Sequence, residues 1–204
     1  QIDIASEPRW SRVNGTFGED PALATDMARA YCDGFQSSPE DGGGWGAHSV
    51  NAMVKHWPGG GSGEGGRDAH FDYGKYAVYP GGQFETLLKP FVEGAFRLSG
   101  GTGVAAAVMP YYTISYGQNG GSGSNRGNSY NHYLITELLR GRYGYDGVVC
   151  TDWMITSDVT GVSRFEGKCW GAENLSVPQR HYEILKAGVD QFGGNNDKQP
   201  VLMA

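Results

Sequence analysis

The sequence predicts an α/β fold in which strands and helices alternate around a parallel sheet. Several short runs rich in Val, Ile and Ala lack polar alternation, as strands buried on both faces do. Amphipathic segments of helical periodicity lie between these runs, which is typical of βα units. Polar or aromatic residues follow four of the runs. This pattern favours a (β/α)8 barrel of the TIM-barrel type over an open doubly wound sheet, because such barrels carry function at strand ends.

Five strands are expected, fewer than a complete barrel contains. They are Ile2–Ala5, Val50–Lys55, Val104–Met109, Gly147–Thr151 and Gly188–Phe192. A (β/α)8 barrel needs eight strands and usually about 250 residues. The chain has 204 residues. We therefore expect residues 1–204 to form one domain that is an incomplete barrel.

Four helices are expected between the strands. The first spans residues 20–35, with Asp20 as its N-cap and Pro21 at its first position. One face of this helix carries Leu23, Met27, Ala30 and Tyr31. The other three helices span residues 84–98, 130–144 and 178–188. Pro90 is expected to kink or split the helix over 84–98, because proline removes a helical hydrogen bond.

Composition and charge exclude several classes of function. The net charge of −6 argues against binding to nucleic acid or to an anionic membrane surface. No apolar run approaches the roughly 18 to 20 residues of a membrane span. Three cysteines are too few for a disulfide framework, and their spacing fits no zinc site. The five histidines include no pair at ligand spacing flanked by carboxylates, so neither a metal nor a cofactor is expected.

Glycine is the compositional outlier, with 34 residues, or about 17% against a usual 7% or so. The glycines gather in residues 41–46, 58–68, 79–82 and 117–129. Such long loops in a compact domain are often functional. Residues 61–66 satisfy the G-x-G-x-x-G pattern of dinucleotide sites. The segment after them has no helical periodicity, so no helix N-terminus is expected to hold a pyrophosphate there.

The strand ends carry the candidate site residues. Lys55 and His56 follow one expected strand, Tyr112 follows another, and Asp152 and Trp153 follow a third. Asp152 is the most informative, because aspartate is a poor strand former and its carboxylate is costly to bury without partners. An N-cap role for Asp152 and a solvated pair for Lys55 and His56 are the simpler alternatives. Three tryptophans lie beside charged strand-end residues: Trp10, Trp57 and Trp153. Aromatic faces next to charged groups are typical of a sugar-binding site.

Four stretches resemble motifs of glycoside hydrolase family 3, in the same order along the chain. They are EPRWSRVNGTFGEDPAL, VKHWPGG, AVMPYYT and LLRGRYGYDGVVCTDW. AGVDQF resembles the strand that follows them, so the resemblance runs to about Asn196. It implies a barrel catalytic domain and a retaining β-glycosidase acting on β-glucosides or short β-glucans. Such an enzyme works through a covalent glycosyl–enzyme intermediate.

The resemblance also implies a role for individual residues. Asp152 matches the catalytic nucleophile, and Lys55 and His56 match the pair that grips sugar hydroxyls. It also implies that Arg12, Tyr112 and Trp153 lie at the substrate site. Arg67, in the loop that follows Lys55 and His56, is a further candidate for substrate contact. Arg67 is equally able to pair with Glu64 or Asp68. Two positions depart from the family's pattern: Glu7 replaces an aspartate, and Ser11 replaces a glycine.

The acid/base is harder to place. In most family members it is a glutamate in a second domain, so we expect the remainder of the same enzyme to supply it together with the early barrel strands. One branch, the β-N-acetylhexosaminidases, uses a histidine in an Asp-x-His loop. Asp68 and His70 lie in a comparable loop and are the alternative acid/base.

Three functional classes remain open at this point. The first is a retaining β-glycosidase, with β-glucosidase, β-xylosidase and β-N-acetylhexosaminidase as its variants. The second is a non-catalytic sugar-binding module of the same fold. The third is an unrelated nucleotide-dependent α/β enzyme, which the lack of a helix after residues 61–66 disfavours. A carbohydrate is the expected partner, and we expect a periplasmic or secreted location rather than a cytoplasmic one.

Overall fold

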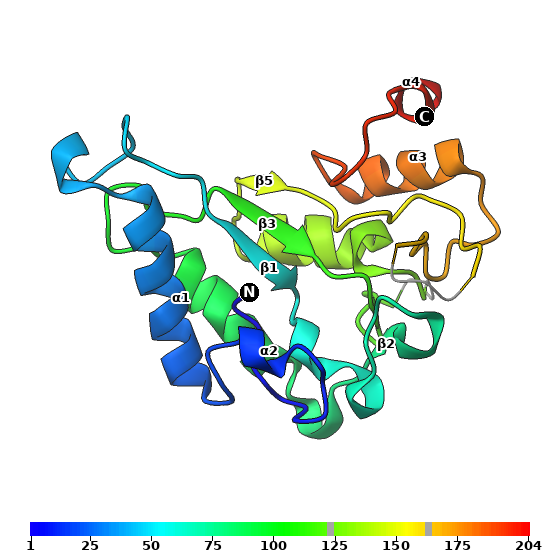
Figure 1. The fold of residues 1–204 in the computed structure, drawn as a ribbon, viewed down its shortest axis with the longest axis horizontal. Coiled ribbons are helices and arrows are strands. Elements are labelled where there is room, and N and C mark those ends of the chain that lie inside the picture. The colour runs from blue at the N-terminus through cyan, green and yellow to red at the C-terminus, as the bar shows by residue number, and fades with distance from the viewer. Residues whose placement is uncertain (122–124, 162–164) are drawn as a thin grey trace.

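The computed structural model describes residues 1–121, 125–161 and 165–204, and its centre is a parallel sheet (Figure 1). The sheet has the strand order β1-β3-β5, formed by Met53–Trp57, Ala107–Pro110 and Val148–Val149. A second pair of parallel strands joins β2 (Tyr76–Ala77) to β4 (Ile114–Ser115). The parallel α/β class predicted from the sequence is therefore confirmed. Residues 122–124 of the glycine-rich stretch 117–129 lie outside the described residues.

The two outer strands that the sequence predicts do not form. Residues 2–5 lie beside β1, where the Ile2 N–H donates to the Lys55 carbonyl at 2.8 Å, and residues 188–192 make a single parallel bridge, from Gln191 to Cys150. One reason lies in Asp190, whose carboxylate accepts the Val149 N–H at 2.7 Å in place of a backbone carbonyl. The apolar pattern thus located both segments correctly but did not predict that side chains would take over their pairing.

The start of β1 was also predicted three residues too early. The strand begins at Met53 and continues through Trp57, so Lys55 and His56 lie inside it instead of after it. Residues 50–52 precede the strand, and the Ala52 carbonyl already accepts the Ala107 N–H at 3.0 Å. The peptide bonds Lys55–His56 and Trp57–Pro58 are cis.

The first helix, α1, spans Pro21–Gln36 and begins where Asp20 accepts the Leu23 N–H at 2.8 Å, as predicted. Its larger apolar side chains are exposed: Leu23, Met27 and Tyr31. Its buried face is made of smaller or polar residues: Ala24, Thr25, Ala28, Cys32 and Gln36. Small side chains let α1 approach the next helix closely, because a Cβ on Gly94 would lie only 2.7 Å from the Thr25 carbonyl oxygen.

Pro90 splits the second helix as predicted, into α2 (Phe84–Lys89) and the π-helix η7 (Pro90–Ala95). Three helices follow: the π-helix η9 (Tyr133–Arg142), α3 (Val177–Ala187) and α4 (Gln199–Met203). The 3-10 turns are η1 (Val13–Gly15), η2 (Pro39–Asp41), η3 (Gly60–Ser62), η4 (Glu64–Gly66), η5 (Asp72–Gly74), η6 (Pro80–Gly82) and η8 (Asn128–Tyr130). None of the helices in the described part of the chain is long and apolar enough to cross a membrane.

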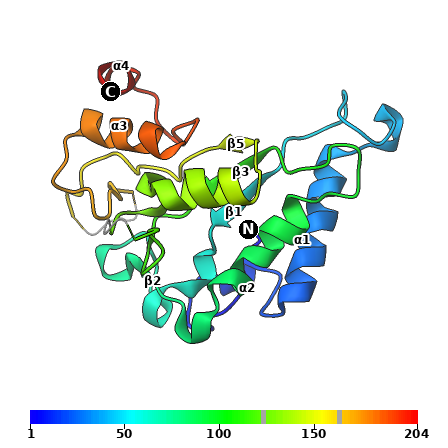
Figure 2. The ribbon, with the colours of Figure 1, turned by 180° about the vertical axis from the view of Figure 1, so that it is seen from behind.

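The core lies between the sheet and the helices beside it. The strands lie in front of η9 in Figure 1 and behind it in Figure 2, so η9 covers one face of the sheet. Its buried residues Leu134 and Leu138 belong to the same apolar cluster as Val108 and Val149 of the strands. Because the three strands are parallel, their carboxyl ends meet at one edge of the sheet, and the candidate residues lie there.

Candidate active site

Asp152 lies just beyond the end of β5 and is only 7% exposed. Its Oδ1 accepts the Trp153 N–H at 2.8 Å, and its Oδ2 lies 3.9 Å from Nε2 of His56, which belongs to β1. Tyr112, two residues past β3, interacts with the same carboxylate. Burial, with the Asp152 charge acting in the same direction, raises the pKa of the Tyr112 phenol well above its usual range. The carboxyl ends of β1, β3 and β5 thus bring His56, Tyr112 and Asp152 together.

His56 is fully buried and is oriented by Asp3. Its Nδ1 lies 2.7 Å from Asp3 Oδ2, and Asp3 Oδ1 accepts the backbone N–H groups of His56 and Gly60 at 2.9 and 2.6 Å. Burial lowers the pKa of His56 although Asp3 acts in the opposite direction. A neutral ring that donates from Nδ1 to Asp3 has an acceptor at Nε2, and an Nη2 of Arg12 lies 3.3 Å from that atom.

The glycine-rich stretch 58–68 packs against this buried pair. A Cβ on Gly60 would lie 2.9 Å from Asp3 Oδ2 and 3.0 Å from His56 Nδ1, and a Cβ on Gly61 would lie 2.0 Å from the Ile4 carbonyl oxygen. The stretch forms the 3-10 turns η3 and η4, so no α-helix begins at the G-x-G-x-x-G match. In this part of the chain the glycines allow close packing around His56.

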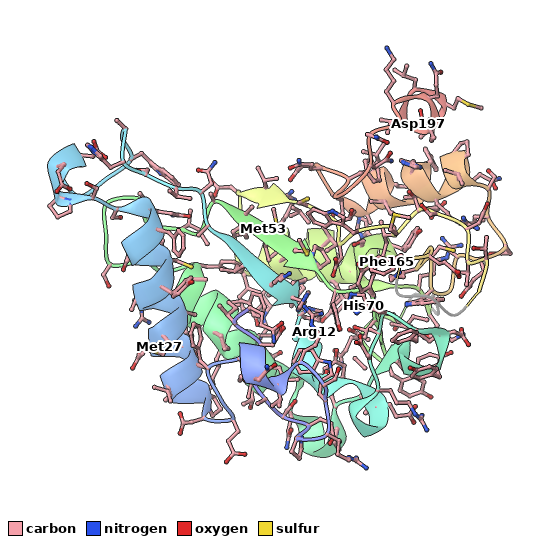
Figure 3. All side chains as sticks on the ribbon, viewed as in Figure 1. Arg12, Met27, Met53, His70, Phe165 and Asp197 are labelled. Carbon is pink, nitrogen blue, oxygen red and sulfur yellow. The ribbon has the colours of Figure 1, made fainter. Side chains whose placement is uncertain are left out.

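Arg12 brings a positive charge to the same edge of the sheet. Its guanidinium lies 5.7 Å from the ring centroid of Trp10 and 5.8 Å from that of Tyr111, and an Nη1 lies 3.3 Å from the Tyr111 hydroxyl. Burial opposes the charge, but Tyr111, Asp3 and Asp152 outweigh it and raise the pKa of Arg12. Figure 3 shows Arg12 and His70 near the carboxyl ends of β1 and β3.

Asp68 and His70 form a hydrogen-bonded pair beside Tyr112. His70 Nδ1 lies 2.6 Å from Asp68 Oδ1, and the His70 ring makes an edge contact with Tyr112 at a centroid distance of 4.9 Å. Burial opposes ionisation of Asp68, but the hydrogen bonds from the His70 ring and backbone outweigh it and lower the pKa of Asp68 to about 2. Trp170 fixes the loop by donating from Nε1 to the Ala69 carbonyl at 2.9 Å.

Trp153 is 46% exposed. Its ring lies against two glycines, Gly193 and Gly194, in the loop that follows residues 188–192. A Cβ on Gly193 would lie 2.7 Å from Trp153 Cζ3, and a Cβ on Gly194 would lie 2.2 Å from Trp153 Cδ1. The ring is therefore held against the backbone of Gly193 and Gly194. A partly exposed aromatic ring held in this way offers a surface on which an apolar sugar face can stack.

Two predicted binding residues lie in different surroundings. The Arg67 side chain is 54% exposed and pairs with Glu64 at 3.5 Å, which is one of the two ion pairs considered from the sequence. Lys55 is half-buried in β1, and its backbone carbonyl accepts the Ile2 N–H at 2.8 Å. The contacts just described therefore place Arg67 at the surface and Lys55 beside residues 2–5.

Sequence reasoning missed Asp3 and Lys168. Asp3 carries the same signal as Asp152, an aspartate inside an apolar run, and that signal could have been used. Lys168 carries no motif, yet it is 1% exposed and its Nζ lies 5.7 Å from the Tyr112 ring centroid. Arg12 and Lys168 therefore bring two cationic side chains to the surroundings of Asp152.

The comparisons agree in pointing to one family. The model of the glycosyl hydrolase family 3 N-terminal domain matches residues 1–190. The chain is 41% identical to the periplasmic β-glucosidase/β-xylosidase of Dickeya chrysanthemi and 42% identical to β-glucosidase C of Emericella nidulans. Each alignment covers all of this chain but only 32% and 31% of those proteins. A β-glucosidase structure from Erythrobacter marinus superposes with a TM-score of 0.70 at 26% identity, covering 99% of this chain and 23% of that one.

Proposed function

The chain belongs to glycosyl hydrolase family 3, and from that premise we propose that it carries the nucleophile of a retaining β-glycosidase. The substrates proposed are terminal β-D-glucosyl residues of glucosides or short β-glucans. The observation that carries the proposal is the buried Asp152 carboxylate at the carboxyl edge of the sheet, with its Oδ2 3.9 Å from His56. Relatives described as β-glucosidases support the substrate class, and the Dickeya relative, described as a β-glucosidase/β-xylosidase, makes β-xylosides the first alternative.

In the proposed reaction the ionised Asp152 attacks the anomeric carbon of the bound sugar. The bond from that carbon to the leaving oxygen breaks while an acid protonates the oxygen, which leaves a glycosyl ester on Asp152. The same acid/base then takes a proton from water, which attacks the anomeric carbon and releases Asp152 as a carboxylate. Two successive inversions release the sugar with its original β configuration.

The surrounding residues have separate proposed roles. His56, Arg12 and Lys55 bind sugar hydroxyls, His56 through an orientation that Asp3 fixes. Trp153 stacks on the sugar, and Tyr112 lies against the nucleophile. Arg67 binds substrate only if it leaves its exposed pairing with Glu64, so we place it at the rim of the site.

The chain spans about a third of the length of the curated relatives it matches. We propose that the rest of a complete gene product supplies the remaining strands of a (β/α)8 barrel and a glutamate acid/base. The name of the Dickeya relative supports a periplasmic or secreted location for that protein.

A second candidate is a β-N-acetylhexosaminidase with His70 as its acid/base. The observation that favours it is the 2.6 Å contact from Asp68 to His70 beside Tyr112. If His70 is the acid, His70→Gln will slow substrates with poor leaving groups by about 100-fold or more and will spare substrates with activated leaving groups. If the acid lies elsewhere, both classes will change by the same small factor.

The test is the stereochemistry of hydrolysis, followed by proton NMR on the complete gene product. Aryl β-glucoside, β-xyloside and β-N-acetylglucosaminide are compared, with Asp152→Asn as the control. The proposal predicts that β-glucose appears first and that the glucoside is the best of the three substrates. Initial release of α-glucose would contradict a retaining mechanism. Binding without any turnover by the folded protein would support the sugar-binding module instead.

A further inference from the structure

Lys168 is a buried cation whose position no recognised motif explains. It is 1% exposed, and its backbone N–H donates to the Met154 carbonyl at 3.0 Å, which holds it close to the turn that carries Asp152. Its ammonium donates to the Glu166 carbonyl and lies 5.7 Å from the Tyr112 ring centroid. An ammonium group is costly to bury, so its position at this site calls for compensating negative charge.

The charges around Lys168 are those of the proposed site. Burial lowers the pKa of its ammonium, and the groups that act in the opposite direction are Asp152 first, then Glu166 and Asp68. The hydrogen bond to the Glu166 carbonyl uses one of the three ammonium hydrogens. The Lys168 ammonium therefore lies near Asp152, on the side of the Tyr112 ring. It comes from the segment that follows Asp152 in the chain.

Among the other described groups around Asp152, the cation is Arg12. Burial lowers the pKa of His56, which favours its neutral form, and burial raises the pKa of the Cys150 thiol and of the Tyr112 phenol. The guanidinium of Arg12 is held in place by its contacts with His56 and Tyr111. A carboxylate that is only 7% exposed is costly to bury, and a second cation beside it offsets part of that cost.

We propose that Lys168 is a positioning residue that holds the nucleophile Asp152 in its ionised form and packs its ammonium on the face of Tyr112. The inference rests on the proposed function, since it assigns Lys168 to the glycosylation step. Once Asp152 becomes a neutral ester, the charge of Lys168 has no carboxylate to stabilise. We therefore expect Lys168 to affect the rate at which the glycosyl–enzyme intermediate forms. We also expect it to affect the pH at which the acidic limb of the pH–rate profile for that step lies.

The experiment measures the rate of inactivation by a 2-deoxy-2-fluoro-glucosyl fluoride across pH in the complete gene product. Lys168→Gln can still donate to the Glu166 carbonyl, and Lys168→Met keeps the aliphatic stem, but neither carries a charge. In both, the acidic limb should move to higher pH by about one unit, because removing a nearby cation raises a carboxyl pKa. Lys168→Arg retains the charge and should keep the limb where it is in the natural protein.

Lys186 provides a matched control. Its Nζ lies 5.7 Å from the ring centroid of Tyr182 on the exposed side of α3, so it has the same cation–aromatic distance as Lys168 but does not face Asp152. Lys186→Met should leave the limb unchanged. Partial unfolding of a variant lowers the inactivation rate by the same factor at each pH. It therefore reduces the height of the pH–rate profile but does not change the pH at which the acidic limb lies.

An unmoved limb in both uncharged Lys168 variants, with the label still on Asp152, would overturn the inference and leave the proposed function standing. A natural protein that is not labelled on Asp152 would instead overturn the proposed function.

Discussion

Asp3 and Asp152 are both buried carboxylates at the same edge of the sheet, yet their partners differ. The two oxygens of Asp3 accept three hydrogen bonds, two from His56 and one from Gly60. Asp152 accepts the Trp153 N–H at Oδ1 and interacts with the phenol of Tyr112. A carboxylate with fewer donors keeps lone pairs available for attack, so Asp3 is suited to orient His56 and Asp152 to react.

The first prediction separates these two aspartates. Asp152→Ala should lower kcat/KM by on the order of 1,000-fold or more, because it removes the attacking atom, with little loss of stability. Asp3→Asn should lower the free energy of unfolding by about 2 kcal/mol, because the amide nitrogen of Asn cannot accept the hydrogen bond from His56 Nδ1. Urea denaturation and steady-state kinetics on the same variants check both. Equal losses of stability in the two variants would contradict the division of roles.

The second prediction concerns the pH dependence that Asp68 contributes. Its pKa in the folded protein is about 2, against roughly 3.9 in an unfolded chain. A depressed pKa stabilises the folded state above the unfolded value, and that stabilisation is lost as the pH falls from about 4 towards 2. The difference in unfolding free energy between the natural protein and Asp68→Asn should therefore shrink over that range. A difference that stays constant from pH 6 to pH 3 would contradict the pairing with His70.

At the scale of secondary-structure elements, local signals in the sequence correctly predicted where helices begin and break. The pairing of the outer strands was predicted wrongly. Asp20 and Pro21 marked the start of α1, and Pro90 marked the break between α2 and η7, because capping and the missing proline N–H act within one turn. Whether residues 188–192 pair as a strand depends on Asp190, whose carboxylate replaces a backbone acceptor of the sheet. Such a replacement is invisible to hydrophobic periodicity.

The same limit applies to the candidate site. Asp152, His56 and Tyr112 were identifiable from motifs at strand ends, and the structure brings them together. Lys168 was not identifiable, because the loop that carries it approaches Asp152 only through the fold.

The third prediction concerns the loop on which Trp153 lies. Gly194 has a φ of +67°, and a Cβ there would lie 2.2 Å from the indole ring. Gly194→Ala and Trp153→Ala should each raise KM for an aryl β-glucoside by about 10-fold, since each removes or displaces one stacking contact. Gly144→Ala is the matched control, because Gly144 has a φ of +66° with nothing within 4 Å of the added Cβ. An equal rise in KM in the control would attribute the effect to backbone strain.

At the scale of the whole molecule, large apolar side chains are exposed along one flank of the sheet in the described part of the chain. A cavity of about 290 Å³ beside β1 is lined by Ile2, Phe17, Tyr31 and Met53, among others. The exposed apolar face of α1 adjoins it at Tyr31 and includes Met27. The proposed barrel would cover this flank with further βα units of the complete protein.

The fourth prediction tests that coverage. Met27→Glu should lower the free energy of unfolding of the complete gene product by about 2 kcal/mol, because it would bury an unpaired charge. Tyr182→Glu, at an exposed apolar position on α3, should change it by less than about 0.5 kcal/mol. Thermal or urea unfolding distinguishes the two. If Met27→Glu leaves the free energy of unfolding unchanged, the face of α1 stays open to solvent. That result would argue against a closed barrel.

The central claim, that Asp152 is the nucleophile, is tested most directly by mass spectrometry after treatment with a 2-deoxy-2-fluoro-glucosyl reagent that carries an activated leaving group. Such a reagent needs little acid assistance, so the result does not depend on where the acid/base lies. The account predicts one fluoroglucosyl group per molecule, on the peptide that contains Asp152, and its loss in Asp152→Asn. A stoichiometric adduct on another residue, or no adduct on a folded complete protein, would contradict it.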